Sequence, residues 1–149
     1  MVDVCEGCSC ESYLLRTNVG DSKLREKGEL LLIGSCMRER YPDIVSEYSQ
    51  KNSDKAVLHV CLEEVHMNHA GYKLASIVRY ASIKSVTALS IDGSPHCVQL
   101  HYLIEDIKRH FTPEIATQHF VVEKGQVVEI SPDTVKRSRH LSKIGSSIG

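Results

Sequence analysis

Cysteine is the residue type that most clearly points to chemistry in this sequence. Six cysteines are present, and three of them, Cys5, Cys8 and Cys10, lie within six residues near the N-terminus. Three thiolates at this spacing can wrap one metal ion or one corner of a cluster. The segment lacks the second Cys-x2-Cys pair of a zinc ribbon, so a fourth ligand must come from elsewhere. A terminal segment whose cysteines bind nothing specific is the alternative.

The other three cysteines, Cys36, Cys61 and Cys97, each lie at, or a few residues past, the end of a different apolar run. If these runs are parallel strands, their carboxyl ends meet at one edge of a sheet, where open α/β folds bind ligands. Three separate segments would then deliver a thiol to the same edge. The competing interpretation is that each cysteine fills a small gap in the core as an inert side chain.

Histidines supply further candidate ligands in the middle third of the chain, at His59, His66, His69, His96 and His101. His96 neighbours Cys97, and Cys97 with His101 forms an i, i+4 pair that faces one way on a helix. His66 and His69 form a second pair of this kind if their segment is helical. Asp92, at the mouth of a predicted strand, is a candidate base or ligand-orienting group, with His96 as the other catalytic candidate.

The pattern of apolar residues predicts an α/β fold. Short apolar runs at 30–33, 56–60 and 86–91 predict strands, and helical patterns follow each of them, opening at Pro42, carrying Leu74 to Ala81, and spanning 98–111. Strands that alternate with helices imply parallel pairing and right-handed crossovers. Residues 118–122 and 126–130 flank Glu-Lys-Gly and predict a β-hairpin. We therefore expect three layers, with a mostly parallel sheet of about four to five strands.

The two ends of the chain lack this periodicity. Residues 1–28 are expected to form a cysteine-rich, loop-rich arm, residues 29–142 a single α/β domain, and residues 143–149 a flexible Gly/Ser-rich tail. Between hairpin and tail, Ser131 and Pro132 provide an N-cap and a first helical residue for a basic helix that reaches about Leu141.

Composition excludes several classes of function. With 18 basic and 19 acidic residues, a net charge near −1 gives no sign of a binder of nucleic acid or of an anionic membrane. No apolar run is long enough to span a membrane, and no signal peptide opens the chain, which favours a cytoplasmic protein. In that reducing compartment, cysteines favour metal or redox chemistry over disulfides. No Walker loop, GxGxxG, GxSxG or HExxH motif is present.

Residues 34–40 have the sequence Gly-Ser-Cys-Met-Arg-Glu-Arg and are followed by Pro42 and Asp43. This segment and the later segment 92–102 resemble the iron–sulfur delta subunit family of methyl-viologen-reducing hydrogenases. In that family, strand-end cysteines hold an iron–sulfur cluster that passes electrons to a heterodisulfide reductase. The resemblance implies this role for Cys36 and Cys97. The family's other loop cysteine falls at Asp92 or Ser94 here.

The same segments also resemble a β-class carbonic anhydrase, whose zinc is held by a cysteine in Cys-x-Asp-x-Arg and by a later His-x-x-Cys. Cys36, Arg40 and Cys97 match this pattern, and residues 68–71 are similar to the family's Asn-Ala-Gly segment. Arg38 stands at the aspartate position and Ser94 at the histidine position. The resemblance thus implies a shared fold and a zinc kept by Cys36, Cys97 and a substitute His96 or His66, without carbonic anhydrase activity.

These patterns predict a metal-binding protein, with an iron–sulfur cluster, expected to be 4Fe-4S, as the first choice and zinc as the second. An electron-transfer or redox-sensing subunit acting with a redox partner or in a larger complex is the leading hypothesis, and a homo-oligomer is also compatible. A zinc-dependent hydratase or hydrolase and a metal-free thiol redox protein are the alternatives. The candidate metal ligands are Cys5, Cys8, Cys10, Cys36, Cys61, Cys97, His66 and His96.

Overall fold

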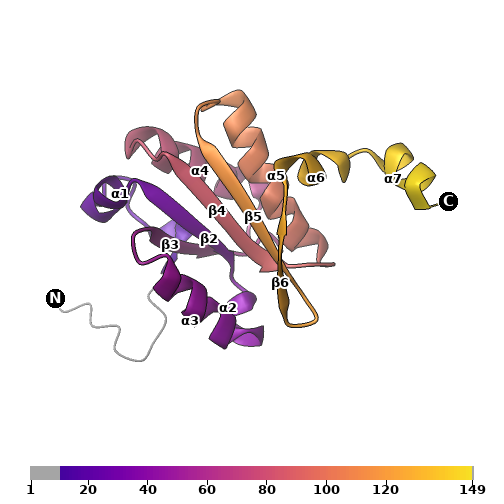
Figure 1. The fold of residues 1–149 in the computed structure, drawn as a ribbon. Coiled ribbons are helices and arrows are strands. Elements are labelled where there is room, and N and C mark those ends of the chain that lie inside the picture. Colours follow the sequence, from indigo (N-terminus) through magenta and orange to yellow (C-terminus); the bar gives the residue numbers. More distant parts are fainter. Residues whose placement is uncertain (1–10, 149) are drawn as a thin grey trace.

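The computed structural model describes residues 11–148 and contains one six-stranded sheet (Figure 1). The strands have the spatial order β1-β3-β2-β4-β5-β6, and all pairs are parallel except β5 with β6. The α/β fold, the mostly parallel sheet and the C-terminal hairpin are therefore confirmed. The strands are β1 (Ser12–Tyr13), β2 (Glu29–Gly34), β3 (Ala56–Val60), β4 (Ser85–Ile91), β5 (Ala116–Glu123) and β6 (Gln126–Ile130).

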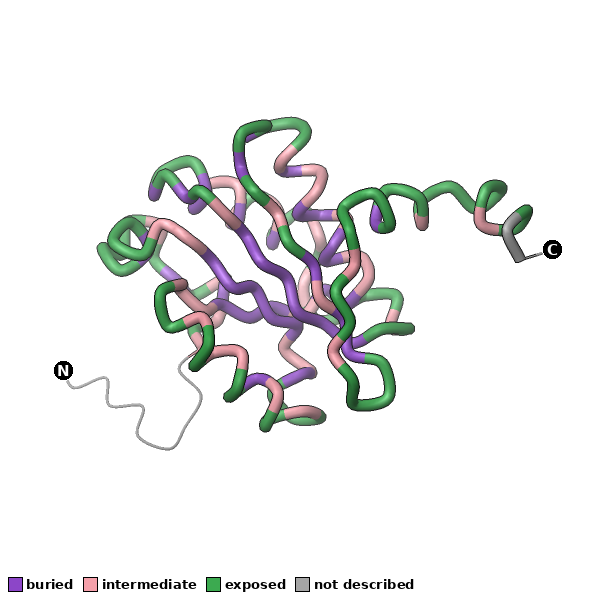
Figure 2. Tube along the Cα trace, viewed as in Figure 1, coloured by how far each residue is buried: buried purple, intermediate pink, exposed green. Residues whose placement is uncertain are grey.

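Helices cover both faces of this sheet. They are α1 (Ser22–Lys27), α2 (Met37–Arg40), α3 (Pro42–Lys51), α4 (Met67–Tyr80), α5 (Pro95–His110), α6 (Pro132–Arg137) and α7 (Leu141–Ile148), with a 3-10 turn, η1, at Leu14–Arg16. Side chains alternate along each strand, so odd-numbered residues of β2 pack with α2 and α3 while even-numbered residues pack with α4 and α5. Both strand faces are buried, as Figure 2 shows for the centre of the sheet.

The chain changes direction across the sheet between β2 and β4. After β2, it crosses through α3 on one face to reach β3, and after β4 it crosses through α5 on the opposite face to reach β5. The loops leaving β2 and β4 therefore lead to opposite faces of the sheet. This arrangement is the topological switch point at which open α/β sheets bind ligands.

Residues 11–28 differ from the loop-rich arm that the sequence suggests. They form β1, η1 and α1, with Leu14 and Leu24 buried in the core. Asp21 caps the start of α1 by accepting from the backbone N–H of Lys23, and Gly28 ends it in the left-handed region at φ 69°. Elements of two to six residues are too short to produce a recognisable period, so the pattern was missed.

The C-terminal segment differs as well. The basic helix α6 stops at Arg137, and α7 occupies most of the segment expected to be a flexible tail, lying beyond α6 at the far end of the chain in Figure 1. No helix between residues 11 and 148 is long and apolar enough to cross a membrane.

Candidate functional site

Cys36 and Cys97 meet at the switch point. Their Sγ atoms lie 3.6 Å apart, although the two residues are 61 positions apart in the chain. Cys36 follows β2 through a two-residue turn and Cys97 lies in the first turn of α5. A Cβ at Gly34 would lie 3.6 Å from the Cys97 sulfur and 4.0 Å from the Cys36 sulfur, so the glycine leaves room for the pair.

The placement of Cys97 corrects one prediction. The apolar pattern predicts a helix that begins at residue 98, but α5 begins at Pro95. Proline at the first helical position, after Ser94 in the N-cap position, is a recognised helix start, and this signal was overlooked. Cys97 therefore lies on a helix, buried at 7% exposure, and Cys36 at its side is half-buried.

The remaining cysteines are placed less completely. Cys61 follows β3 directly, as predicted, and its charge acts on Cys36. Cys5, Cys8 and Cys10 lie outside the described residues. Between residues 11 and 148, no three cysteine, histidine, aspartate or glutamate side chains are grouped so as to hold a metal ion. The described part of the chain therefore supplies a sulfur pair rather than a complete ligand set.

The environment of this pair keeps the Cys36 thiol protonated. Burial, followed by the neighbouring Cys97 and Cys61 sulfurs, raises the pKa of Cys36 to about 12. At neutral pH, the thiolate forms only when a nearby positive charge compensates for its burial. A metal cation provides such a charge.

The predicted histidine and aspartate candidates lie apart from the sulfur pair. His66 is the N-cap of α4, where its Nδ1 accepts from the backbone N–H of Asn68. The His96 ring is half-exposed and its Nδ1 lies 4.0 Å from Glu63 Oε2. Asp92 is exposed and accepts from the backbone N–H of Gly93 within its own turn. None of these three side chains has a recorded contact with Cys36 or Cys97.

A second group of polar side chains is buried between α5 and the sheet. Ser90 Oγ lies 2.6 Å from His101 Nε2, His101 Nδ1 lies 2.8 Å from His119 Nδ1, and His119 Nε2 lies 2.6 Å from Glu105 Oε2. Burial and the adjacent His119 lower the pKa of His101 to about 3. Both ring nitrogens of His101 have hydrogen-bond partners in this structure, Ser90 through Nε2 and His119 through Nδ1.

A third polar group lies beside the Cys36 turn. His59 on β3 lies 2.8 Å from Ser35 Oγ through Nδ1 and 3.1 Å from Arg38 Nη1 through Nε2. An arginine always donates, so Nε2 must accept and Nδ1 carries the proton toward Ser35. Burial, followed by the charge of Arg38, lowers the pKa of His59. These residues, with Tyr13, line a cavity of about 1010 Å³ that opens at the carboxyl end of β3.

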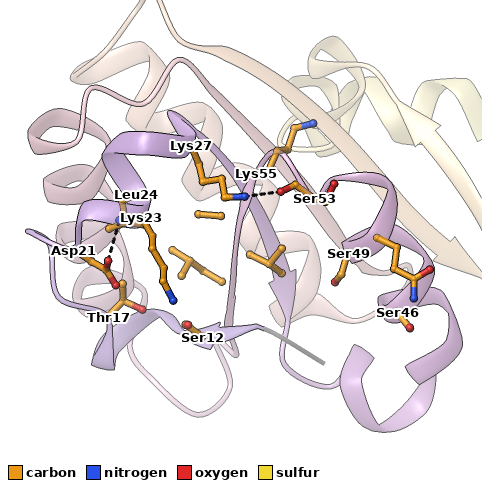
Figure 3. Close-up of a pocket in the computed structure, with 14 residues that line it drawn as sticks. Ser12, Thr17, Asp21, Lys23, Leu24, Lys27, Ser46, Ser49, Ser53 and Lys55 are labelled. Atoms are coloured by element: carbon orange, nitrogen blue, oxygen red, sulfur yellow. Dashed lines mark hydrogen bonds between the residues drawn. The ribbon is translucent and has the colours of Figure 1, made fainter. Parts of the chain in front are cut away.

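Another cavity, of about 530 Å³, lies over the outer edge of β3 between α1 and α3 (Figure 3). Lysine side chains stand around it, and Lys27 Nζ donates to the carbonyl oxygen of Ser53. Its lining includes residues 56–58, at the start of β3, so it lies toward the strand end opposite to the thiols. None of the three described cysteines lines it.

An open, mostly parallel sheet with helices on both faces and a switch point between β2 and β4 is typical of proteins of the Rossmann type. The chain belongs to the Rossmann-like domain family, whose model matches residues 22–148. This match includes β2 to β6, and thus both cysteines of the pair. No curated protein and no solved structure matches the chain.

Proposed function

We propose that this protein binds a metal centre through cysteine thiolates at the switch point, with Cys36 and Cys97 as ligands. An iron–sulfur cluster that serves electron transfer or redox sensing is the first choice, and zinc is the second. The observation that carries the proposal is the 3.6 Å separation of the two sulfurs, one from the turn after β2 and the other from the first turn of α5, which follows β4. The resemblance to the hydrogenase delta subunit family supports the same role for these two residues.

The separation of the sulfurs favours a shared metal ion. Two thiolates on one tetrahedral metal, each about 2.3 Å away, lie about 3.8 Å apart. The pair in this structure is close to that value without rearrangement. In a 4Fe-4S cluster each thiolate binds a different iron, so the two sulfurs would move apart for both residues to serve such a cluster.

The raised pKa of Cys36 favours a metal over an activated thiol nucleophile. Reactive cysteines have a depressed pKa because a positive charge or a helix N-terminus stabilises the thiolate. Cys36 has the opposite shift. A bound cation reverses the balance, because it displaces the thiol proton and compensates for the burial.

The other ligands come from the remaining cysteines in this proposal. Cys61 follows the neighbouring strand, and the N-terminal cysteines supply three more thiols. Glu11, the residue after Cys10, lies 3.9 Å from Arg38 Nε, on the helix that follows Cys36. This contact ties the first described residue to the segment that carries one of the proposed ligands.

Anaerobic metal and sulfide analysis, with a visible spectrum before and after dithionite, tests the proposal. We expect stoichiometric metal in the wild type and loss of most of it in Cys36→Ser, in Cys97→Ser and in the Cys5/Cys8/Cys10→Ser triple variant. Met37→Leu is the matched control, because it conserves volume in the same buried turn and leaves every sulfur ligand in place. Iron with sulfide identifies a cluster, and zinc alone identifies the second choice.

Metal-free wild-type protein, or metal retained by both single serine variants, would contradict the proposal.

The same sulfur distance also favours a second candidate, a dithiol–disulfide couple between Cys36 and Cys97. The sulfurs would have to close from 3.6 Å to about 2.05 Å. Mass spectrometry of protein oxidised without metal distinguishes this case, because a disulfide lowers the mass by two hydrogens and joins the two cysteine peptides.

A further inference from the structure

Three buried side chains and one partly buried side chain form a continuous hydrogen-bonded chain, which we call the histidine relay: Ser90 on β4, His101 and Glu105 on α5, and His119 on β5. Ser90 and His119 are fully buried, and His101 is 2% exposed. The Glu105 side chain retains 17% exposure, so the relay reaches solvent at that end. Its three links measure between 2.6 and 2.8 Å. The proposed function uses none of these four residues.

The relay has two fully hydrogen-bonded arrangements that differ by one proton. In the first, Ser90 donates to His101 Nε2, His101 Nδ1 donates to His119 Nδ1, and His119 Nε2 donates to the Glu105 carboxylate. Both imidazoles are neutral. In the second, His119 is an imidazolium that donates to Glu105 and to His101 Nδ1, and His101 Nε2 donates to Ser90. His101 is neutral in both, which agrees with its lowered pKa.

The inner end of the relay lies beside the sulfur pair. Ser90 Cβ and the Cys97 sulfur lie 3.7 Å and 3.6 Å from the point where a Gly34 Cβ would stand. Because Gly34 has no side chain, that point is open. Cys97 and His101 are also one turn apart on α5 and face the same way. In the second arrangement, the Ser90 hydroxyl no longer donates to His101 and is available to a negatively charged neighbour.

We propose that the histidine relay is a proton-binding site coupled to the charge of the thiolate centre. If the centre held a redox-active metal, a one-electron donor would add one negative charge there, and one proton would enter the relay from solvent at Glu105. Oxidation of the centre returns that proton to solvent. No covalent bond outside the relay forms or breaks. The inference rests on the proposed function, since it assigns the relay to that centre.

The charged groups around the relay leave Glu105 as the main local influence. On α5, Asp106 pairs with Arg109 and with Arg139, which follows α6. On β6, Glu129 accepts from Gln118, next to His119 on β5. On α6, Lys136 and Arg137 are exposed. β4 contributes only Ser90 to the relay, and this side chain is uncharged. Between residues 11 and 148, Glu105 is the one charged group hydrogen-bonded to either histidine.

Side-chain ¹⁵N NMR of histidine-labelled protein between pH 5 and 9 tests the coupling without any metal. Cys97→Asp places a carboxyl group at the centre, and Cys97→Ser is the neutral control of similar size. We expect the pH midpoint of proton uptake by the relay to be about one unit higher in the aspartate variant, a tenfold gain in proton affinity. If Cys97→Asp does not fold, Cys36→Asp and Cys36→Ser, at the half-buried position, replace the pair.

Between pH 5 and 9, Glu105→Gln is expected to abolish proton uptake by the relay, and His101 is expected to stay neutral in every variant. Equal midpoints in the aspartate and serine variants would overturn the proposal, and so would a protonated His101. The second measurement is the midpoint potential of the metal-loaded protein, expected to fall by up to about 59 mV per pH unit in wild type and to be flatter in Glu105→Gln. A pH-independent wild-type potential also contradicts the coupling.

The two proposals fail in different ways. If no metal binds but the aspartate variant shifts the midpoint, the relay responds to charge at position 97 and the metal proposal is wrong. If metal binds and neither the midpoint nor the potential responds, the thiolate centre stands and the relay is only structural.

Discussion

Acid should destabilise this protein through His101. In the folded protein the pKa of His101 is lowered to about 3, against an ordinary value of 6.5 that applies to the unfolded chain. Between these two values the unfolded state binds more protons than the folded state, so stability rises with pH there and is lost as pH falls below 6.5. From pH 7.5 to pH 5.0 the loss from this one residue is about 2 kcal/mol.

Urea denaturation at a series of pH values between 7.5 and 5.0 measures this loss. His101→Asn removes the titrating ring and keeps an amide near the position of Nδ1, so the variant should lose about 2 kcal/mol less than the wild type over the same interval. His69→Asn is the matched control, because His69 is exposed on α4 and its removal should leave the wild-type slope. Equal slopes for His101→Asn and wild type would refute the linkage.

Three further predictions concern single residues. Gly34→Ala should be tolerated, because its Cβ would stand in ordinary contact with the Cys97 sulfur. Gly34→Val should fold but lose metal uptake, because its added methyl groups press on the sulfur pair. Metal analysis checks both variants. Gly28→Ala should lower the free energy of unfolding by about 1 kcal/mol, because position 28 has a φ of 69°, and thermal denaturation measures it. In metal-free protein, Cys36 should react with iodoacetamide about a thousand times more slowly at pH 7.5 than an ordinary thiol, because its pKa lies near 12. Peptide mapping by mass spectrometry measures the rate of labelling. Rapid labelling of Cys36 at neutral pH would contradict the assigned protonation.

The elements that the sequence predicted well are those with long, regular patterns. β3 was expected at residues 56–60 and has those bounds, and the hairpin of β5 and β6 is confirmed with the turn at Lys124 and Gly125. The buried second half of β3 makes that strand read as an apolar run, and an amphipathic helix follows β3 and another follows β4. β1 has only two residues, so it carried no periodic signal and its pairing with β3 depends on the tertiary structure.

The candidate site was predictable in part for the same reason. Strand ends locate Cys36 and Cys61 directly, because parallel strands share one edge. The histidine relay could not be predicted, since its members come from three elements and their spacing along the chain has no motif. One signal was available: His119 shares strand parity with the buried Val121, and His101 follows Leu100 within the apolar stripe of α5. Histidines at core positions indicate a buried polar network more often than a surface site.

The two buried groups together determine how the protein should respond to acid. Metal binding displaces a proton from each thiol, so metal affinity falls about tenfold per displaced proton for each pH unit of acidification. Because burial keeps Cys36 protonated, this dependence extends across the whole neutral range. The contribution of His101 at pH 6 is only about 0.8 kcal/mol, because most of its loss occurs at lower pH. Mild acidification therefore weakens the proposed centre well before it threatens the fold. In this proposal, metal binding by the sulfur pair responds to mild acid, whereas the stability that the scaffold loses through His101 is lost mostly at lower pH.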